Sequence, residues 1–321
     1  MELAGKKVVV TGGAGLVGSH IVDELVKEKA EVTVYDNFVR GKRENLKKSL
    51  DSGLVTIVEA DICDRETLKK TFAGKDLCFH EAAVWLKACQ DEPRKALEIN
   101  TTGTFNVLET CVASGIKKIV AASSSSVYGD GLYFPTDEKH PFNNDLFYGA
   151  GKIADEQWYR AFRKKYGLDF IAFRYLNIYG PRQPFLGAYT DVIMNFFNKL
   201  DENLPPRIEG DGSQTLDLVY VGDCARANIM AMKSAVSGEY FNVSSGKETT
   251  LKELAEILIK VSGKKDIKPE YVPRDKNLVT RRFGSADKAK SMLGFTVTTS
   301  LEQGLKNILA WREEVKKREA K

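Results

Sequence analysis

The stretch VVVTGGAGLVG, residues 8–18, decides the fold. A short β-branched run leads directly into glycines at positions 12, 15 and 18, and an amphipathic helical pattern begins near Leu16. Gly12 permits a tight turn, Gly15 lets the backbone approach a pyrophosphate, and Gly18 lets the helix pack on the strand. The free N–H groups at the start of such a helix favour an anion. This stretch therefore predicts the first strand, turn and helix of a dinucleotide-binding α/β domain.

The alternation of strand and helix continues through the first half of the chain. Strands are expected at 8–10, 31–35, 55–59, 77–80, 118–121 and 170–173, and helices near 16–29, 64–73, 92–114 and 147–166. Six parallel strands in this rhythm predict a doubly wound Rossmann sheet over residues 1–174. Residues 175–321 contain more loops, with helices near 250–262 and from about 300. They are expected to form mainly a smaller, C-terminal substrate-binding domain that is interleaved with the first.

Asp36 stands at the end of the second expected strand, 18 residues beyond Gly18. A carboxylate at this place accepts both ribose hydroxyls of an adenosine and repels a 2′-phosphate, so the sequence predicts NAD rather than NADP. Arg40, Lys42 and Arg43 follow closely. They either soften this preference or form the exposed start of the next helix.

Two further motifs follow later strands, SSSSVYG at 123–129 and YGAGK at 148–152. Open α/β sheets bind ligands beyond the carboxyl ends of their strands, so both motifs are expected beside the cofactor. Tyr148 and Lys152 share one helix face, and the Lys152 ammonium favours the phenolate form of Tyr148, which suits acid–base chemistry. A serine hydroxyl from 123–129 completes the hydrogen-bonding set. The GAGK segment is not a P-loop, because Leu146 and Ile153 stand where Gly and Ser or Thr are required.

These motifs occur together with ADI at 60–62, HEAA at 80–83, EINTTGTFNVLE at 98–109, RYLNIYGPRQ at 174–183 and GDGSQTLDLVYVGD at 210–223. As a set they resemble the extended short-chain dehydrogenase/reductase family. Within it they are similar to the NAD-dependent nucleotide-sugar epimerases and dehydratases. The resemblance covers nearly the whole chain.

The resemblance implies a role for each matching residue. Tyr148 is the acid/base, Lys152 binds the nicotinamide ribose and tunes Tyr148, and Ser124 hydrogen-bonds the reacting hydroxyl. The implied cofactor-binding residues are Gly12, Gly15, Leu16, Val17, Asp36, Asn37, Asp61, Ile62, Ala82, Ala83, Asn100, Ser123, Tyr148, Lys152 and Tyr175. The implied substrate-binding residues are Ser124, Ser125, Tyr148, Asn177, Arg274 and Arg282. No metal is expected.

The resemblance also separates reactions. Dehydratases of the family carry an Asp-Glu pair after the reactive residue, and decarboxylases carry a Glu just before VYG, whereas this chain has Ser125 and Ser126 there. Epimerisation at C4 of a nucleotide sugar, a UDP-hexose or UDP-hexuronate, is therefore implied. Tyr148 would take the proton of the 4-hydroxyl while C4 gives its hydride to NAD, and the hydride would return to the opposite face of a rotated 4-keto sugar.

Several alternatives stay open at this point. UDP-glucose, UDP-N-acetylglucosamine and UDP-glucuronate all suit the motifs. The rival functions are a 4-keto reductase, a dehydratase that uses a different acid, and a non-catalytic protein that binds NAD or a nucleotide sugar.

The chain departs from the family pattern where the substrate diphosphate is bound. Leu216 stands in place of the usual arginine of GDGxQTRD, and the later Arg-x-Gly-Asp motif is altered, PRDKNLVTRRFGSADKA at 273–289. Arg274 and Arg282 are preferred to Arg281 as diphosphate ligands, because a guanidinium presents a bidentate fork. Each of them is equally well a surface arginine.

Three aromatic residues are either stacking or core residues: Trp85, Trp158 and Tyr179.

Composition excludes several other classes of protein. The 48 basic and 44 acidic residues are interspersed, which does not favour a nucleic-acid partner. No apolar run approaches the roughly 18 residues that span a bilayer, and no signal peptide precedes the first strand. Five cysteines without metal-ligand spacing favour a reducing compartment and buried thiols. A cytoplasmic location is therefore expected.

The helices near 92–114 and 147–166 are apolar on more than one stripe, which leaves apolar surface beyond what the sheet covers. The family pairs such helices into a four-helix bundle, so the resemblance implies a homodimer. The apolar positions are Ala96, Ile99, Phe105, Leu108, Val112, Ile153, Trp158, Ala161 and Phe162.

Overall fold

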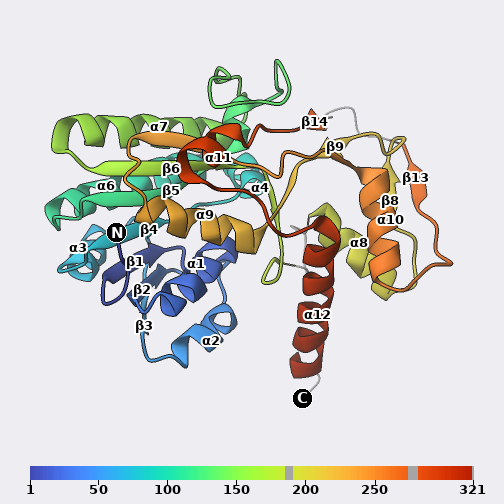
Figure 1. Ribbon diagram of the computed structural model, residues 1–321, viewed down its shortest axis with the longest axis horizontal. Coiled ribbons are helices and arrows are strands. Elements are labelled where there is room, and N and C mark those ends of the chain that lie inside the picture. The colour runs from blue at the N-terminus through green and yellow to red at the C-terminus, as the bar shows by residue number, and fades with distance from the viewer. Residues whose placement is uncertain (185–190, 274–280, 320–321) are drawn as a thin grey trace.

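A parallel sheet of seven strands forms the centre of the computed structural model, which describes residues 1–184, 191–273 and 281–319 (Figure 1). The strand order is β11-β6-β5-β4-β1-β2-β3. Their bounds are β1 (Lys7–Thr11), β2 (Glu31–Asp36), β3 (Val55–Glu59), β4 (Leu77–His80), β5 (Lys118–Ser124), β6 (Asp169–Tyr175) and β11 (Glu239–Val243). The doubly wound Rossmann fold expected from the sequence is confirmed, and all six predicted strands are present.

The prediction of six strands was wrong by one. β11 pairs in parallel with β6, from Glu239 opposite Ile171 to Val243 opposite Tyr175. It is preceded by α9 (Val221–Lys233), which packs on α1 (Leu16–Lys27). The pattern EYFNV was missed because residues 176–238, which form helices and short strands of their own, separate it from β6, and nothing local shows that it returns to the first sheet. The boundary at residue 174 stays a prediction.

Helices cover both faces of the sheet, and alternate residues of each strand point to opposite faces. Val8 and Val10 pack toward α1 and α9, whereas Val9 packs toward the other layer. That layer consists of α3 (Arg65–Phe72), α6 (Thr104–Ala113) and α7 (Phe147–Tyr166), which Figure 1 shows on the opposite side from α1 and α9. The near-continuous apolar runs of these strands are thereby explained.

The helix expected near 92–114 is real but not uniform. It begins with α5 (Pro93–Lys95), widens into the π-helix η2 (Ala96–Gly103) and continues as α6. In the π-helical part, Asn100 is fully buried and bonds the backbone of Val84 in both directions. A further short helix before it, α4 (Leu86–Asp91), was not predicted.

The second part of the chain has its own core, at the right of Figure 1. Its helices are α8 (Val192–Asp201), α10 (Leu251–Val261) and α12 (Leu301–Glu319), and α11 (Asp287–Leu293) returns beside β11. Its strands are β7 (Asn177–Tyr179) with β10 (Leu218–Tyr220), β8 (Arg207–Glu209) with β13 (Glu270–Val272), and β9 (Thr215–Leu216) between β12 (Thr249–Thr250) and β14 (Arg281–Arg282). The short pairing of β9 with β14 brings Arg281 and Arg282 next to Thr215 and Leu216, which are far from them in the sequence.

Within the described ranges, no helix has both the length and the apolar character that a bilayer span requires. Cys78, Cys89, Cys111 and Cys224 are buried as free thiols, but Cys63 is exposed, so the expectation of buried cysteines was wrong for that residue. Among residues 1–184, 191–273 and 281–319, no group of three or more His, Cys, Asp or Glu side chains has a metal-binding arrangement.

Candidate active site

A cleft of about 690 Å³ opens beyond the carboxyl ends of β1, β2, β4, β5 and β6. Its size suits a small-molecule or cofactor site. Most of the residues singled out in the sequence line it. They are Gly12, Gly15, Leu16, Val17, Asp36, Asn37, Asp61, Ile62, Ala82, Ala83, Ser123, Ser124, Tyr148, Lys152 and Tyr175.

Four of the predicted residues that the structure describes are not among those that line this cleft, and a fifth is not described. Asn100 lies behind it, bonded to Val84, and Ser125 is buried in the short helix η3 (Ser125–Tyr128). Asn177 donates from Nδ2 to the Asp217 carbonyl oxygen at 3.1 Å, and Arg282 lies on β14. Arg274 falls outside the described residues.

The glycine-rich turn is shaped by two close approaches. Gly12 has a φ of +67°, and a Cβ there would lie 2.6 Å from the backbone nitrogen of Ala82. A Cβ on Gly18 would collide with the carbonyl oxygen of Gly12. Both positions therefore require glycine, and α1 begins directly behind the turn with its first N–H groups unpaired within the helix. The turn forms a cradle for an anion.

Asp36 is held in one orientation at the far end of the cleft. Its Oδ2 accepts from Ala14 N at 2.9 Å and its Oδ1 from Phe38 N at 2.8 Å. Burial raises the pKa of Asp36, and these two N–H donors oppose that rise. Each carboxylate oxygen keeps a second lone pair for a hydroxyl in the cleft. Next to it, Asn37 Nδ2 donates to Asp61 Oδ2 at 2.7 Å.

The three basic residues after Asp36 have different surroundings. Lys42 and Arg43 are exposed, and Arg43 pairs with Glu59. Arg40 is exposed as well, but it enters the cleft, where its guanidinium lies 4.5 Å from the ring centroid of Trp85. Burial lowers the pKa of Arg40. Lys42 and Arg43 therefore match the expectation of an exposed start to the next helix. Arg40 lies in the cleft, where it could affect the choice of cofactor.

Lys152 reaches the cleft from the buried face of α7. Its Nζ donates to the Ala122 carbonyl oxygen at 3.1 Å and to Asp155 Oδ2 at 3.3 Å. Burial acts to lower the pKa of Lys152, but Asp155 and Tyr148 outweigh burial and raise it. Lys152 is therefore a fixed, charged ammonium beside Tyr148.

Gly149 explains how α7 comes so close to the segment SSSSVYG at 123–129, called the serine loop below. A Cβ there would collide with the side chain of Asn144 and lie 2.8 Å from the Ser126 carbonyl oxygen. The close approach that the glycines of YGAGK suggest is therefore real at Gly149. Ser124 lines the cleft, donates to Ser126 Oγ at 3.1 Å and accepts from Ser126 N at the same distance.

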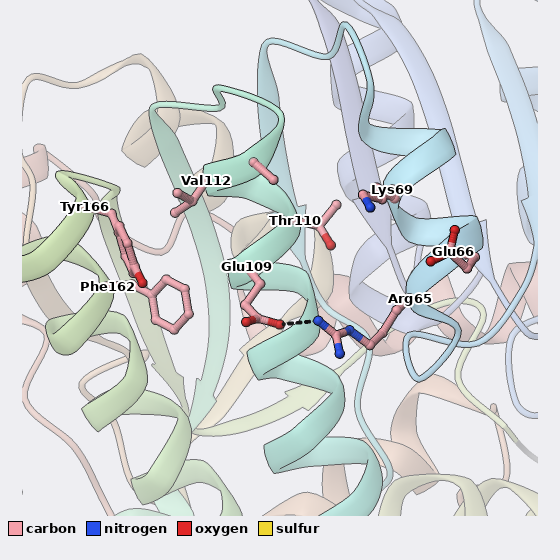
Figure 2. Close-up of a pocket in the computed structure, with 9 residues that line it drawn as sticks. Arg65, Glu66, Lys69, Glu109, Thr110, Val112, Phe162 and Tyr166 are labelled. Atoms are coloured by element: carbon pink, nitrogen blue, oxygen red, sulfur yellow. Dashed lines mark hydrogen bonds and ion pairs between the residues drawn. The ribbon is translucent and has the colours of Figure 1, made fainter.

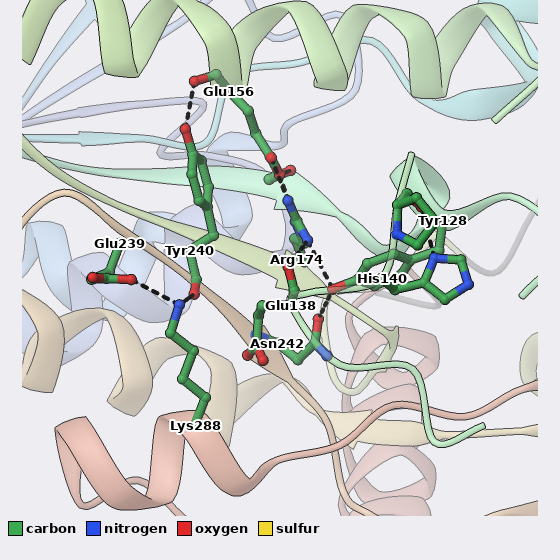
Figure 3. A network of polar contacts seen from close by, with 11 residues as sticks. Tyr128, Glu138, His140, Glu156, Arg174, Glu239, Tyr240, Asn242 and Lys288 are labelled. Atoms are coloured by element: carbon green, nitrogen blue, oxygen red, sulfur yellow. Dashed lines mark hydrogen bonds and ion pairs between the residues drawn. The ribbon is translucent and has the colours of Figure 1, made fainter. Parts of the chain in front are cut away.

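A buried polar network supports this loop from behind (Figure 3). Arg174 donates from Nε and Nη2 to the two carboxylate oxygens of Glu156, at 2.8 and 2.6 Å. Glu156 also accepts from Ser123 Oγ at 2.6 Å, and Arg174 Nη1 donates to Tyr128 Oη at 3.1 Å. Tyr128 donates onward to Asn242 on β11. The network joins α7, the serine loop, β6 and β11, and so fixes the strand end that carries Ser123.

Sequence reasoning missed several residues of the cleft. Glu81 and Arg182 line it, and both lie inside motifs that were recognised, HEAA and RYLNIYGPRQ, so the motifs held the signal. Asp155 lies behind the cleft rather than in it, and it had no such signal, because a single acid in a helix is most often a solvated residue. Its burial follows only from the way α7 packs.

The aromatic alternatives are also decided. Tyr179 is 1% exposed and packs edge-on against Tyr220, so it is a core residue. Trp158 is partly buried and packs edge-on against Phe105 at the margin of the core, away from the cleft. Trp85 lines the cleft under Arg40.

A second cavity, of about 510 Å³, lies away from the glycine-rich turn (Figure 2). It is formed by α3, α6 and α7, and an ion pair between Arg65 and Glu109 crosses it at 3.1 Å. None of the described residues that were predicted to bind cofactor or substrate lines it.

Comparison with known proteins agrees with this arrangement. A curated protein of Methanocaldococcus jannaschii, named "Putative UDP-glucose 4-epimerase", is 37% identical over 307 residues, which cover 95% of this chain and 97% of that protein. The UDP-N-acetyl-alpha-D-glucosaminuronate decarboxylase of Bacillus cytotoxicus is 33% identical, over 97% of this chain and 98% of that protein.

A solved structure of a nucleotide-sugar epimerase is also similar to this chain. The UDP-N-acetylglucosamine 4-epimerase of Methanobrevibacter ruminantium, in complex with UDP-N-acetylmuramic acid, superposes with a TM-score of 0.92 at 33% identity, over 97% of this chain and 99% of that one. The model of the NAD dependent epimerase/dehydratase family matches residues 8–244, which include the glycine-rich turn, the motifs at 123–129 and 148–152, and β11. The chain therefore belongs to the NAD dependent epimerase/dehydratase family.

Proposed function

We propose that the protein is an NAD-dependent nucleotide-sugar 4-epimerase that acts on a UDP-sugar. The observation that carries this proposal is the convergence of Ser124, Tyr148 and Lys152 on the cleft that begins at the glycine-rich turn and Asp36. The relatives named for 4-epimerisation of UDP-glucose and UDP-N-acetylglucosamine support the same reaction class.

The residues of the cleft fit NAD. The cradle at Gly12 and Gly18 has no room for a Cβ, and the N-terminus of α1 suits a pyrophosphate. Asp36 would accept hydrogen bonds from the adenosine ribose hydroxyls, and the Lys152 ammonium would donate to the nicotinamide ribose. NAD, when bound, supplies a hydride acceptor that can return the hydride.

Tyr148 would move the proton of the sugar hydroxyl. Lys152 has two of its three N–H groups occupied by described residues, so the third remains for the cleft. The Tyr148 phenolate would accept the proton of the 4-hydroxyl and later return it, with the Lys152 ammonium as the neighbouring positive charge. Ser124 would orient that hydroxyl by a hydrogen bond. Proton loss at oxygen accompanies hydride loss at C4, so a 4-keto sugar forms and both are restored when the opposite face is reduced.

The main competing reaction is decarboxylation of a UDP-uronate, because a decarboxylase is among the similar proteins. Ser125 and Ser126 stand where the resemblance puts the acids of dehydratases and decarboxylases, and both are buried. A hydroxyl cannot take the place of a carboxylic acid as proton donor at neutral pH. This favours epimerisation.

We also propose that Arg282 and Asn177 bind the diphosphate side of the substrate, and that the enzyme is a cytoplasmic homodimer.

The outer face of α6 and α7 supports the dimer. Phe105, Ile153 and Trp158 are only partly buried there, and Tyr166 is 51% exposed beside the cavity in Figure 2. Pairing of these helices by a two-fold axis would cover this surface. Light scattering that gives a monomer at micromolar concentration would contradict the dimer.

A product assay tests the function. NAD-loaded protein is incubated with UDP-glucose, UDP-N-acetylglucosamine and UDP-glucuronate in ²H₂O, and the products are identified by NMR. One substrate should give its 4-epimer, without deuterium at C4, without net NADH and without loss of water or CO₂. A 4-keto-6-deoxy or decarboxylated product would reject the proposal.

A further inference from the structure

Asp155 is a carboxylate on the buried side of Lys152. The two residues lie on successive turns of α7, with Lys152 Nζ 3.3 Å from Asp155 Oδ2, and their side chains are 1% and 0% exposed. Lys152 nevertheless lines the cleft, so the pair joins the core of α7 to the site. The other partner of the ammonium among the described residues is a neutral carbonyl, Ala122 O. Asp155 is thus the nearest compensating charge.

Compensation matters because of burial. A lysine that is buried without an opposite charge has a pKa several units lower than an exposed lysine, so it loses its proton at a lower pH. Burial does act on Lys152 in this direction, yet Asp155, followed by Tyr148 and Glu81, holds its pKa above the ordinary value. Burial raises the pKa of Asp155 to about 7. The carboxylate is therefore ionised throughout the alkaline range in which Lys152 would otherwise deprotonate.

The other oxygen of Asp155 faces neutral polar groups. Oδ1 is buried without a hydrogen-bond partner among the described residues, and the nearby Thr104 hydroxyl lies 2.9 Å from His80 Nε2, while His80 Nδ1 lies 2.7 Å from Thr11 Oγ1. Burial, together with the Lys152 charge, lowers the pKa of His80 to about 3, so this imidazole is neutral. The titratable groups that face Lys152 or Asp155 are Tyr148, Glu156 and Tyr159 from α7, His80 and Glu81 from the end of β4, and Cys89 from α4.

We propose that Asp155 is a positioning residue, whose carboxylate keeps the Lys152 ammonium charged and fixed beside Tyr148. The inference rests on the proposed function for its effect on turnover, but not for its effect on Lys152 itself. Asp155 touches neither substrate nor cofactor in this role. It acts through Lys152, and loss of its charge should lower the pH at which Lys152 gives up its proton.

The test compares Asp155→Asn with Asp155→Glu, which restores the charge. Glu156→Gln is the matched control, because Glu156 is equally buried on the same helix but pairs with Arg174. In NAD-free protein labelled with ¹³C-lysine, the Lys152 side-chain resonance is identified by its absence from Lys152→Arg and followed against pH. Asp155→Asn should shift its midpoint down by about one pH unit or more, since the carboxylate no longer offsets burial.

Turnover gives the second measurement. The alkaline limb of the kcat–pH profile should move to lower pH in Asp155→Asn, return in Asp155→Glu and stay in place in Glu156→Gln. If Asp155→Asn does not fold, Asp155→Ser is used in the same way. A Lys152 midpoint that does not move, or that moves as far in Glu156→Gln, would overturn the proposal. Absence of epimerisation in the unaltered protein would reject the proposed function instead, because the NMR titration still stands.

Discussion

Arg282 on β14 is the direct register partner of Leu216 on β9, across a pair of parallel strands. Leu216 occupies the position where similar proteins are expected to have a diphosphate-binding arginine. Arg282 is half-buried, and burial lowers its pKa while Asp130 acts in the opposite direction. A guanidinium therefore lies next to the position that lacks one.

We expect Arg282→Leu to weaken UDP binding by about tenfold or more, the usual effect of losing a charge-assisted hydrogen bond. Isothermal titration with UDP measures this. Arg281→Leu is the control, because Arg281 is already held by Glu248 at 2.7 and 2.6 Å. The double variant Leu216→Arg/Arg282→Leu should recover part of the affinity. Equal losses in both single variants would show that Arg282 has no special part in binding.

Tyr148→Phe should lower kcat by two or more orders of magnitude while NAD and UDP still bind, because only the proton-transferring oxygen is lost. Cofactor content by absorbance and kcat by coupled assay are measured on the same preparation. Near-normal turnover would remove Tyr148 from the mechanism.

Asp36→Asn should raise the affinity for NADP relative to NAD by about tenfold or more, since the repulsion of a 2′-phosphate disappears while one amide oxygen still accepts from the backbone. The unaltered protein should prefer NAD clearly. Fluorescence titration with the two cofactors decides this, and equal affinity in the unaltered protein would contradict the role of Asp36.

Arg174→Met should reduce the free energy of unfolding by about 3–5 kcal/mol, because the Glu156 carboxylate is then buried without its fork of donors. Urea unfolding of the NAD-free protein measures the loss. Adding Glu156→Gln should restore part of the stability. A double variant less stable than Arg174→Met would mean that the carboxylate is satisfied by other groups.

Glu81 should make the protein less stable as pH rises. Burial raises the pKa of Glu81 to about 8 in the folded protein, against an ordinary value of 4.5. Between these two values the unfolded chain has released this proton and the folded chain has not, so stability falls with increasing pH. The melting temperature of Glu81→Gln, relative to the unaltered protein, should therefore rise between pH 5 and pH 8. A constant difference would show that Glu81 is ionised in the folded protein.

Much of the fold was predictable because its signals are local. The strand that leads into Gly12 and the carboxylate Asp36 can each be recognised from a few neighbouring residues. Both lie where the pattern predicts. The seventh strand was not predictable in this way, because EYFNV has the pattern of any short strand and its pairing with β6 is a contact between distant segments. Tertiary packing selects that partner.

The site was partly predictable for the same reason. Tyr148, Lys152 and Ser124 belong to motifs and reach one cleft. Asp155 and Glu81 were not foreseen, because a carboxylate becomes significant only through what surrounds it, and sequence spacing does not show burial. Asn100, in contrast, was expected to touch the cofactor but lies behind the cleft, where the π-helix turns its side chain onto the backbone of Val84.

During synthesis, β6 is complete at residue 175 but its neighbour β11 is not available until residue 243 has left the ribosome. Throughout that interval β6 is an edge strand with unpaired backbone groups, and until α9 is complete at residue 233 the apolar surface of α1 that packs on α9 also faces water. The nascent chain is therefore open to chaperones and proteases over this interval. A message truncated before β11 is expected to yield an aggregating fragment rather than a free-standing nucleotide-binding module.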